Sequence, residues 1–358
     1  MSPRLPSDLM RRSAQEGSRL LALTYLDEIG SAERRLADPQ DSEALHDFRV
    51  GLRRLRSCIR AYRAQLKGSV SKKLRRRLRD LTVATNPGRD IEVQLEWLHR
   101  QAPRLRPGET EGMAWLSGRL EGRKYESVDR VAAEIGRRFL RTAEKLRSRL
   151  GTFQMEVRTG REPSLPSFGE VTGGLVQDLA GELAECLKAV ASPEQVSESH
   201  AARIRAKRLR YLVEPLSRRV LGAKAFVGRL KQMQDLLGQV HDLQVIIQEI
   251  ESSLSVLSRG APDRPLAART GLEGLRNLAM DEAGAAFARF QAEWSPDRAT
   301  RILARADELR RILGGRIPAA GQSEPDSRRL REGNGKPVSN GQSSSHGSPI
   351  YSQSTAGS

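Results

Sequence analysis

Apolar residues recur every three or four positions along nearly all of the chain up to about residue 314, which is the spacing of amphipathic helices. Alternation of apolar and polar residues, typical of strands, is absent, so the pattern predicts an all-α fold. The stretch 158–167, which contains prolines and a glycine, is a linker that divides the helices into two series. Helices are expected at 8–36, 42–66, 70–84, 89–101, 111–120 and 126–150, and then at 168–190, 195–220, 223–238, 241–257, 266–291 and 297–313.

From Gly314 the composition changes to Gly, Ser, Asn, Gln and Pro. Such a segment cannot bury enough apolar surface to order itself, so residues 315–358 are predicted to form a flexible tail. The predicted helical domain therefore spans 1–314, with halves at about 1–157 and 168–314.

Two pairs of helical segments repeat each other. The stretch HDFRVGLRRLR, from His46, aligns without gaps with HAARIRAKRLR, which starts 154 positions later at His200. A second pair, LRDLTVATNPGRDIEV from Leu78 and LKQMQDLLGQVHDLQV from Leu230, follows with a shift of 152. Two motifs in the same order and at nearly the same offset predict a tandem duplication of one helical unit.

Each copy of the first motif carries an apolar stripe and, beside it, a basic stripe, because successive helix positions turn by about 100°. The basic stripes contain His46, Arg49, Arg53, Arg56 and Arg60 in the first copy and His200, Arg203, Lys207 and Arg210 in the second. A solvated helix face usually mixes charges, since acid–base pairs four residues apart stabilise the helix. Stripes of a single sign that occur twice favour a bound polyanion, which would offset the repulsion.

A third basic run, SKKLRRRLRD at 71–80, places Arg75 and Arg79 on one side of a helix, and Lys231 is the counterpart of Arg79 in the second copy. A solubilising surface and a ligand-binding surface both fit this run, and both interpretations stay open. Asp90 and Asp242, which the second repeat aligns, are interpreted as salt-bridge partners that hold the arginines of the stripes rather than as catalytic acids.

Composition narrows the choice of partner. Lys and Arg number 61 against 44 Asp and Glu, a formal net charge of +17, which attracts polyanions or anionic surfaces. Aromatic residues make up only 4%, so platforms on which bases could stack are scarce. Cys58 and Cys186 lie far apart among helix formers, so we expect no disulfide and a reducing cytoplasm. No apolar run approaches the roughly 20 residues of a membrane span.

The paired motifs resemble the conserved histidine α-helical domain (CHAD) family over about residues 8–314. The resemblance rests on the two aligned stretches at His46 and His200, followed by Arg89-Asp90 and His241-Asp242. It implies two four-helix-bundle-like halves related by a pseudo-twofold axis, a basic central groove, and binding of inorganic polyphosphate. The first copy departs from the family pattern, because it has Thr85-Asn86-Pro87 where the second keeps Leu-Gly, so helix packing near Arg89 is expected to differ.

Inorganic polyphosphate suits the local chemistry, since Arg forks bind adjacent phosphate oxygens in bidentate fashion. The predicted contacts are His46, Arg49, Arg53, Arg56, Arg60, Arg75, Arg79, His200, Arg203, Lys207, Arg210 and Lys231. Nucleic-acid binding is the alternative, because a basic all-α protein can grip phosphates without contacting bases. Association with storage granules or a membrane surface is compatible with polyphosphate binding.

An enzyme is not expected, and we predict no catalytic residue, cofactor or metal site. His46 and His200 lie among arginines that would repel a metal cation. The five histidines form no metal-binding motif such as HExxH.

Overall fold

The computed structural model describes residues 5–38, 40–85, 87–152, 165–193, 195–259, 266–294 and 296–315. The helical part of the chain belongs to one compact unit, Met1–Pro318. Residues 158–164 of the predicted linker and nearly all of the predicted tail lie outside the described residues.

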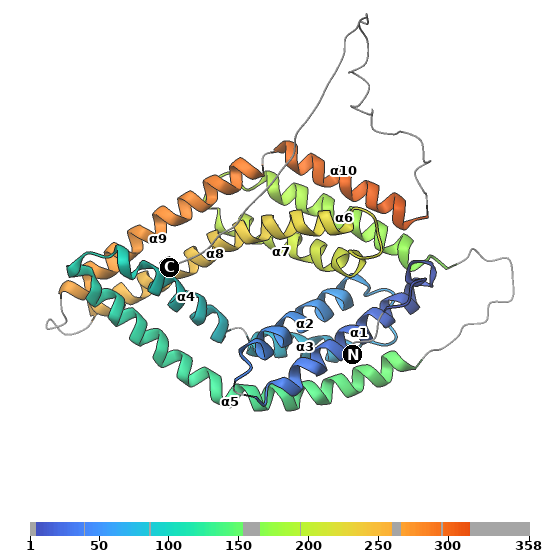
Figure 1. The fold of residues 1–358 in the computed structure, drawn as a ribbon, viewed down its shortest axis with the longest axis horizontal. Helices are drawn as coiled ribbons and strands as arrows, with labels where there is room; N and C mark the ends of the chain where they lie inside the picture. The colour runs from blue at the N-terminus through green and yellow to red at the C-terminus, as the bar shows by residue number, and fades with distance from the viewer. Residues whose placement is uncertain are drawn as a thin grey trace, which may run out of the picture. The chain divides into compact units, whose positions relative to one another are not determined.

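The regular elements of the described residues are helices, as Figure 1 shows, so the prediction of an all-α fold is confirmed. The first series consists of α1 (Ala14–Arg35), α2 (Ser42–Ala61), α3 (Lys72–Ala84), α4 (Pro87–Gln101) and α5 (Thr110–Gly151). The second consists of α6 (Phe168–Lys188), α7 (Val196–Val213), α8 (Ala223–Arg259), α9 (Leu266–Glu293) and α10 (Pro296–Leu313). Short 3-10 helices lie at Leu9–Arg11, Ala102–Arg104, Pro107–Glu109 and Glu214–Leu216.

Two of the predicted helix breaks are wrong. The segments 111–120 and 126–150 form the single helix α5, and 223–238 and 241–257 form the single helix α8. Gly122 and Gly238 lie at the predicted breaks, and a glycine within a helix costs only about 1 kcal/mol. Burial of neighbours such as Leu120 and Leu237 outweighs that cost.

The two copies of the second repeat differ where the sequence departs from the family pattern. Helix α8 runs without interruption through Gln239, whereas its counterpart in the first copy is divided into α3 and α4 at Pro87. Proline lacks the backbone N–H and clashes with the preceding turn, but it is tolerated at the first position of a new helix. Pro87 therefore starts α4.

The helices pack as adjacent pairs around one core. Helix α1 packs on α2, α6 on α7 and α10, and α8 on α9, while α5 lies along α3, α4 and α9. Contacts of α1 with α6, α2 with α7, and α5 with α9 join the first series to the second. Buried apolar side chains from both series form a single cluster, so the two halves share their hydrophobic core.

A reciprocal contact joins the starts of α1 and α6. The N–H of Ala14 donates to the carbonyl of Pro166 at 3.1 Å, and the N–H of Phe168 donates to the carbonyl of Arg12 at 2.8 Å. Ser13 and Ser167 cap the two helices through their hydroxyl oxygens. A twofold axis at this point would produce such a pair of bonds; the pseudo-twofold relation between complete halves stays a prediction.

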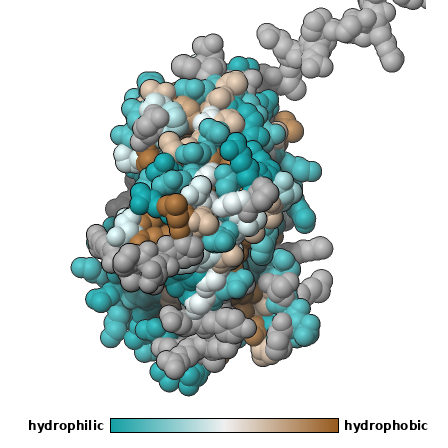
Figure 2. Space-filling view, turned by 90° about the vertical axis from the view of Figure 1, so that its left-hand side faces the viewer, coloured by the Kyte–Doolittle hydropathy of each residue, from teal (hydrophilic) through white to brown (hydrophobic). Residues whose placement is uncertain are grey.

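Hydrophilic residues prevail among the coloured residues of the face seen in Figure 2, with small hydrophobic patches between them. Among the described residues, no helix combines the length and the apolar character needed to cross a membrane.

Candidate anion-binding site

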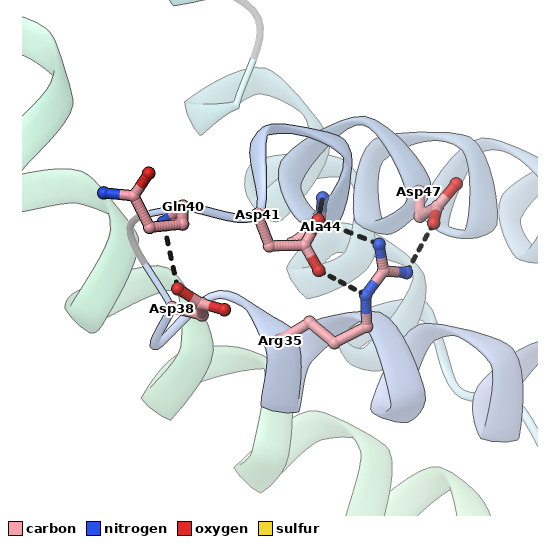
Figure 3. Close-up of polar contacts among 6 residues, drawn as sticks. All are labelled: Arg35, Asp38, Gln40, Asp41, Ala44 and Asp47. Atoms are coloured by element: carbon pink, nitrogen blue, oxygen red, sulfur yellow. Dashed lines mark hydrogen bonds and ion pairs between the residues drawn. The ribbon is translucent and has the colours of Figure 1, made fainter.

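Helix α2, which carries the first basic stripe, is fixed at its start by ion pairs (Figure 3). Asp41 caps the helix by accepting from the N–H of Ala44 at 3.0 Å. Arg35, at the end of α1, donates to Asp41 at 2.7 and 3.0 Å and to Asp47 at 2.6 Å. Asp47 is the only acid within residues 46–60, and α1 engages it, so it does not neutralise the basic stripe.

The apolar stripes hold both motif helices against the core. On α2, Phe48, Leu52 and Leu55 are fully buried, and on α7 the same is true of Ala202, Ala206 and Leu209. Their burial leaves the neighbouring arcs of both helices for the basic side chains, as the periodicity predicts.

The structure brings cations from α2 and α7 together in what we call the central cluster: Arg49, Arg53, Arg203 and Lys207. Burial lowers the pKa of Lys207, the charges of Arg203 and Arg53 add to this effect, and the resulting pKa is about 8. Burial likewise lowers the pKa of Arg203, on which Arg53 also acts. Residues about 150 positions apart in the sequence thus repel one another in a half-buried setting.

Three acids lie beside the central cluster. Asp242 is 4.0 Å from Arg203, and Glu92 is 4.0 Å from Arg49. Burial raises the pKa of Asp90, and so does the neighbouring charge of Asp242, while Arg203 and Arg49 act in the opposite direction. Glu92 lies within the second repeat, but its counterpart in the other copy is the uncharged Gln244, so the repeat did not select it.

Two histidines from the second copy stack on each other. The rings of His200 and His241 are 5.4 Å apart between centroids and tilted by 26°, and Nδ1 of His241 lies 3.3 Å from Asp242. Burial is the largest cause that lowers the pKa of His200, and the charges of His241 and Arg203 lower it further. His46 is exposed on α2, so the two motif histidines have different surroundings.

A second group of cations, which we call the Arg60 cluster, lies at the end of α2: Arg56, Arg60, Arg79 and Arg208. Burial lowers the pKa of Arg56, and Arg60 and Arg79 add to this effect. Burial also lowers the pKa of Arg208, with Arg60 as the next cause. Arg208 belongs to the second motif but not to its basic stripe, so helical periodicity alone did not select it.

The remaining predicted contacts have local partners or are exposed. Arg75 donates to the carbonyl of Val70 at 3.1 Å, and Arg79 lies 3.4 Å from Asp80. The guanidinium of Arg210 lies over the ring of Tyr211, 4.8 Å from its centroid. Lys231 is exposed on α8. The binding roles of these residues, like those of the other predicted contacts, stay predictions.

The chain matches the family model of the CHAD domain over residues 21–251, more than half of its length. It therefore belongs to the CHAD domain family. No curated protein sequence matched it.

The solved structures similar to this chain include two that are described by name. The CHAD domain from the plant Ricinus communis is 20% identical with a TM-score of 0.57, covering 86% of this chain and 94% of that one. PptA from Streptomyces chartreusis is 18% identical with a TM-score of 0.62, covering 79% of this chain and 99% of that one. At these identities the likeness supports the fold alone.

Proposed function

We propose that this chain is a binding module for inorganic polyphosphate. The observation that carries the proposal is the convergence of Arg53 with Arg203 and Lys207, from two helices far apart in the sequence. Crowding like charges in a half-buried setting destabilises the unliganded protein. A linear polyanion that places a charge at each phosphate would offset this repulsion. Membership of the CHAD domain family agrees with such a role.

The arrangement of the site favours a polyanion without bases over a nucleic acid. Single-strand binding usually adds aromatic rings on which bases stack. The tyrosines of the two basic motif helices, Tyr62 and Tyr211, are only 1% and 9% exposed, and Arg210 covers the ring of Tyr211. The cluster thus offers guanidinium and ammonium donors but no stacking surface on these helices.

We assign the site to binding without catalysis, and we place no cofactor or metal in it. Within the described residues, no group of three or more His, Cys, Asp or Glu side chains is arranged to hold a metal ion. Purified protein should leave polyphosphate intact with or without magnesium or manganese. Release of orthophosphate that a substitution in the central cluster abolishes would show an enzyme instead.

The proposed setting is the cytoplasm, where the free thiols of Cys58 and Cys186 stay reduced. Storage granules rich in polyphosphate are compatible with the same binding chemistry.

A competition titration tests the proposed ligand directly. Long-chain polyphosphate, single-stranded DNA and RNA are compared at matched phosphate concentration and one fixed salt concentration, because such affinities depend on salt. We expect polyphosphate to bind most tightly and orthophosphate poorly, since only a polymer gains from several simultaneous contacts. Equal or tighter binding of RNA would favour the nucleic-acid alternative.

A further inference from the structure

The ends of the two motif helices carry opposite charges at matching positions. With the offset of 154 between the repeats, Arg54 corresponds to Arg208, and Arg60 corresponds to Glu214. The basic stripe of the first copy therefore ends in a cation, whereas the second ends in an acid.

At the end of α7, the matching positions form an ion pair between the two copies. Arg54 of α2 donates to the carboxylate of Glu214 and lies 3.8 Å from Glu28 of α1. The three side chains are each about two-thirds buried. The charge of Arg54 is thus neutralised, and the contact links the first copy to the second.

At the end of α2, the same pairing would bring Arg208 to Arg60, which are both cations. The charge of Arg60 lowers the pKa of Arg208, as expected for two neighbouring cations. Glu182 is the counterpart of Glu28, but Arg205 binds it at 2.6 Å, and the first copy has Gly51 in place of Arg205. Within the described part of the chain, neither Arg60 nor Arg208 has a carboxylate within 4.0 Å.

The surroundings of Arg60 add to this excess of positive charge. The charges of Arg60 and Arg79 both lower the pKa of Arg56. The Nε atom of Arg208 is buried and has no hydrogen-bond acceptor among the described residues. The cations of α2, α3 and α7 that act on Arg56 and Arg208 therefore lie in the region where the other copy has a closed ion pair.

We propose that polyphosphate is anchored asymmetrically, with the Arg60 cluster as the main phosphate-binding subsite and the Arg54–Glu214 end serving as a structural link. This inference rests on the proposed function. It adds which part of the protein holds the polyphosphate chain most strongly. Asp80 beside Arg79 and the charge of Glu182 on Arg208 offset the repulsion in the Arg60 cluster only in part. Phosphate oxygens would relieve the remainder, whereas at the other end they would have to compete with Glu214 for Arg54. Electrostatic gain is therefore larger at the end of α2.

The test replaces Arg60 by the residue type of its counterpart. R60E should weaken binding of tripolyphosphate and of long-chain polyphosphate by roughly 10- to 100-fold, since it removes one contact and repels the ligand. The melting temperature of the unliganded variant should not fall, because the new carboxylate faces Arg208 as Glu214 faces Arg54. The matched control is R301E, which makes the same change in net charge at an exposed position of α10 and should alter affinity by less than about threefold.

Two further variants test the asymmetry from both ends. R208Q should weaken tripolyphosphate binding about as much as an R60Q variant does. E214R should strengthen binding of the long polymer about threefold or more, because it frees Arg54 and creates a second cluster of cations.

Separate outcomes distinguish the inference from the proposed function. If the full-length protein binds neither tripolyphosphate nor long-chain polyphosphate, the proposed function is wrong. If it binds them but R60E behaves like R301E, or E214R weakens binding, polyphosphate binding stands and the asymmetric anchor is wrong.

Discussion

At the scale of single residues, the site depends on cations that the fold makes hard to keep charged. Lys207 is the clearest case, because burial and then Arg203 and Arg53 lower its pKa from 10.5 to about 8. Above pH 8 the folded protein releases this proton while the unfolded chain retains it up to about pH 10.5. The stability of the unliganded protein should therefore rise with pH across this window, and at lower pH the full cost of the charge remains.

The same titration should appear in binding. Between pH 7 and pH 9 the affinity for polyphosphate should fall as Lys207 loses its charge, with the midpoint above 8 because a bound polyanion favours the charged form. The K207R variant stays charged throughout and should lose most of this dependence. Calorimetric titrations of both proteins over this range measure the effect, and an identical pH profile for K207R would contradict it.

We expect Arg54, which pairs with Glu214 and Glu28, to serve the fold rather than the ligand. Removing it with R54Q leaves Glu214 and Glu28 without their cation, and we expect a loss of about 1–2 kcal/mol in the free energy of unfolding. Polyphosphate affinity should change by less than about threefold, because this guanidinium is already engaged. Urea unfolding and titration on the same sample separate the two effects. A large loss of affinity with unchanged stability would place Arg54 in the binding site.

At the scale of elements, close helix contacts decide which glycines matter. Gly112 of α5 and Gly271 of α9 meet with their backbones, and a Cβ atom built on Gly112 would lie 2.5 Å from the carbonyl carbon of Gly271. G112A should therefore destabilise the protein by roughly 1–3 kcal/mol, as overpacking does. Gly118 of the same helix has open space around its Cβ position. G118A should instead stabilise by about 0.5–1 kcal/mol, and equal effects of the two variants in urea would contradict this packing.

Periodicity was enough to predict the helices and their apolar faces, because burial of Phe48, Leu52 and Leu55 follows directly from their spacing. It was not enough to predict that α5 and α8 are continuous. Whether a helix continues through a glycine depends on whether packing of its neighbours outweighs the cost of the glycine, and the sequence does not show that packing. For the same reason the roles of Glu92, Arg208 and Glu214 were missed. Their partners come from other helices, and only the folded chain brings them together.

At the scale of the whole molecule, the hydrophobic core and the proposed site both draw on the two copies of the repeat. Central-cluster cations come from α2 and α7, and the acids beside them come from α4 and α8. With a net charge of +17, the protein should bind polyphosphate with an affinity that falls steeply between 50 and 200 mM salt, by the counterion release known for DNA. Titrations at several salt concentrations give the slope. A flat response would contradict an electrostatic site.

The central claim is that both copies of the repeat grip one polyphosphate chain. Two triple variants test it: R49Q/R53Q/R56Q in α2 and R203Q/K207Q/R210Q in α7, with Gln at Arg316, Arg328, Arg329 and Arg331 as the control. Each lost contact of a half-exposed charge costs on the order of 1 kcal/mol.

Binding of long-chain polyphosphate is measured for the three variants at one salt concentration, after circular dichroism has confirmed that each is folded. We expect each triple variant to lose roughly one to three decades of affinity, and the control to lose little. If only one triple variant binds more weakly, or if the control loses as much as the other two, the two copies do not share a single site.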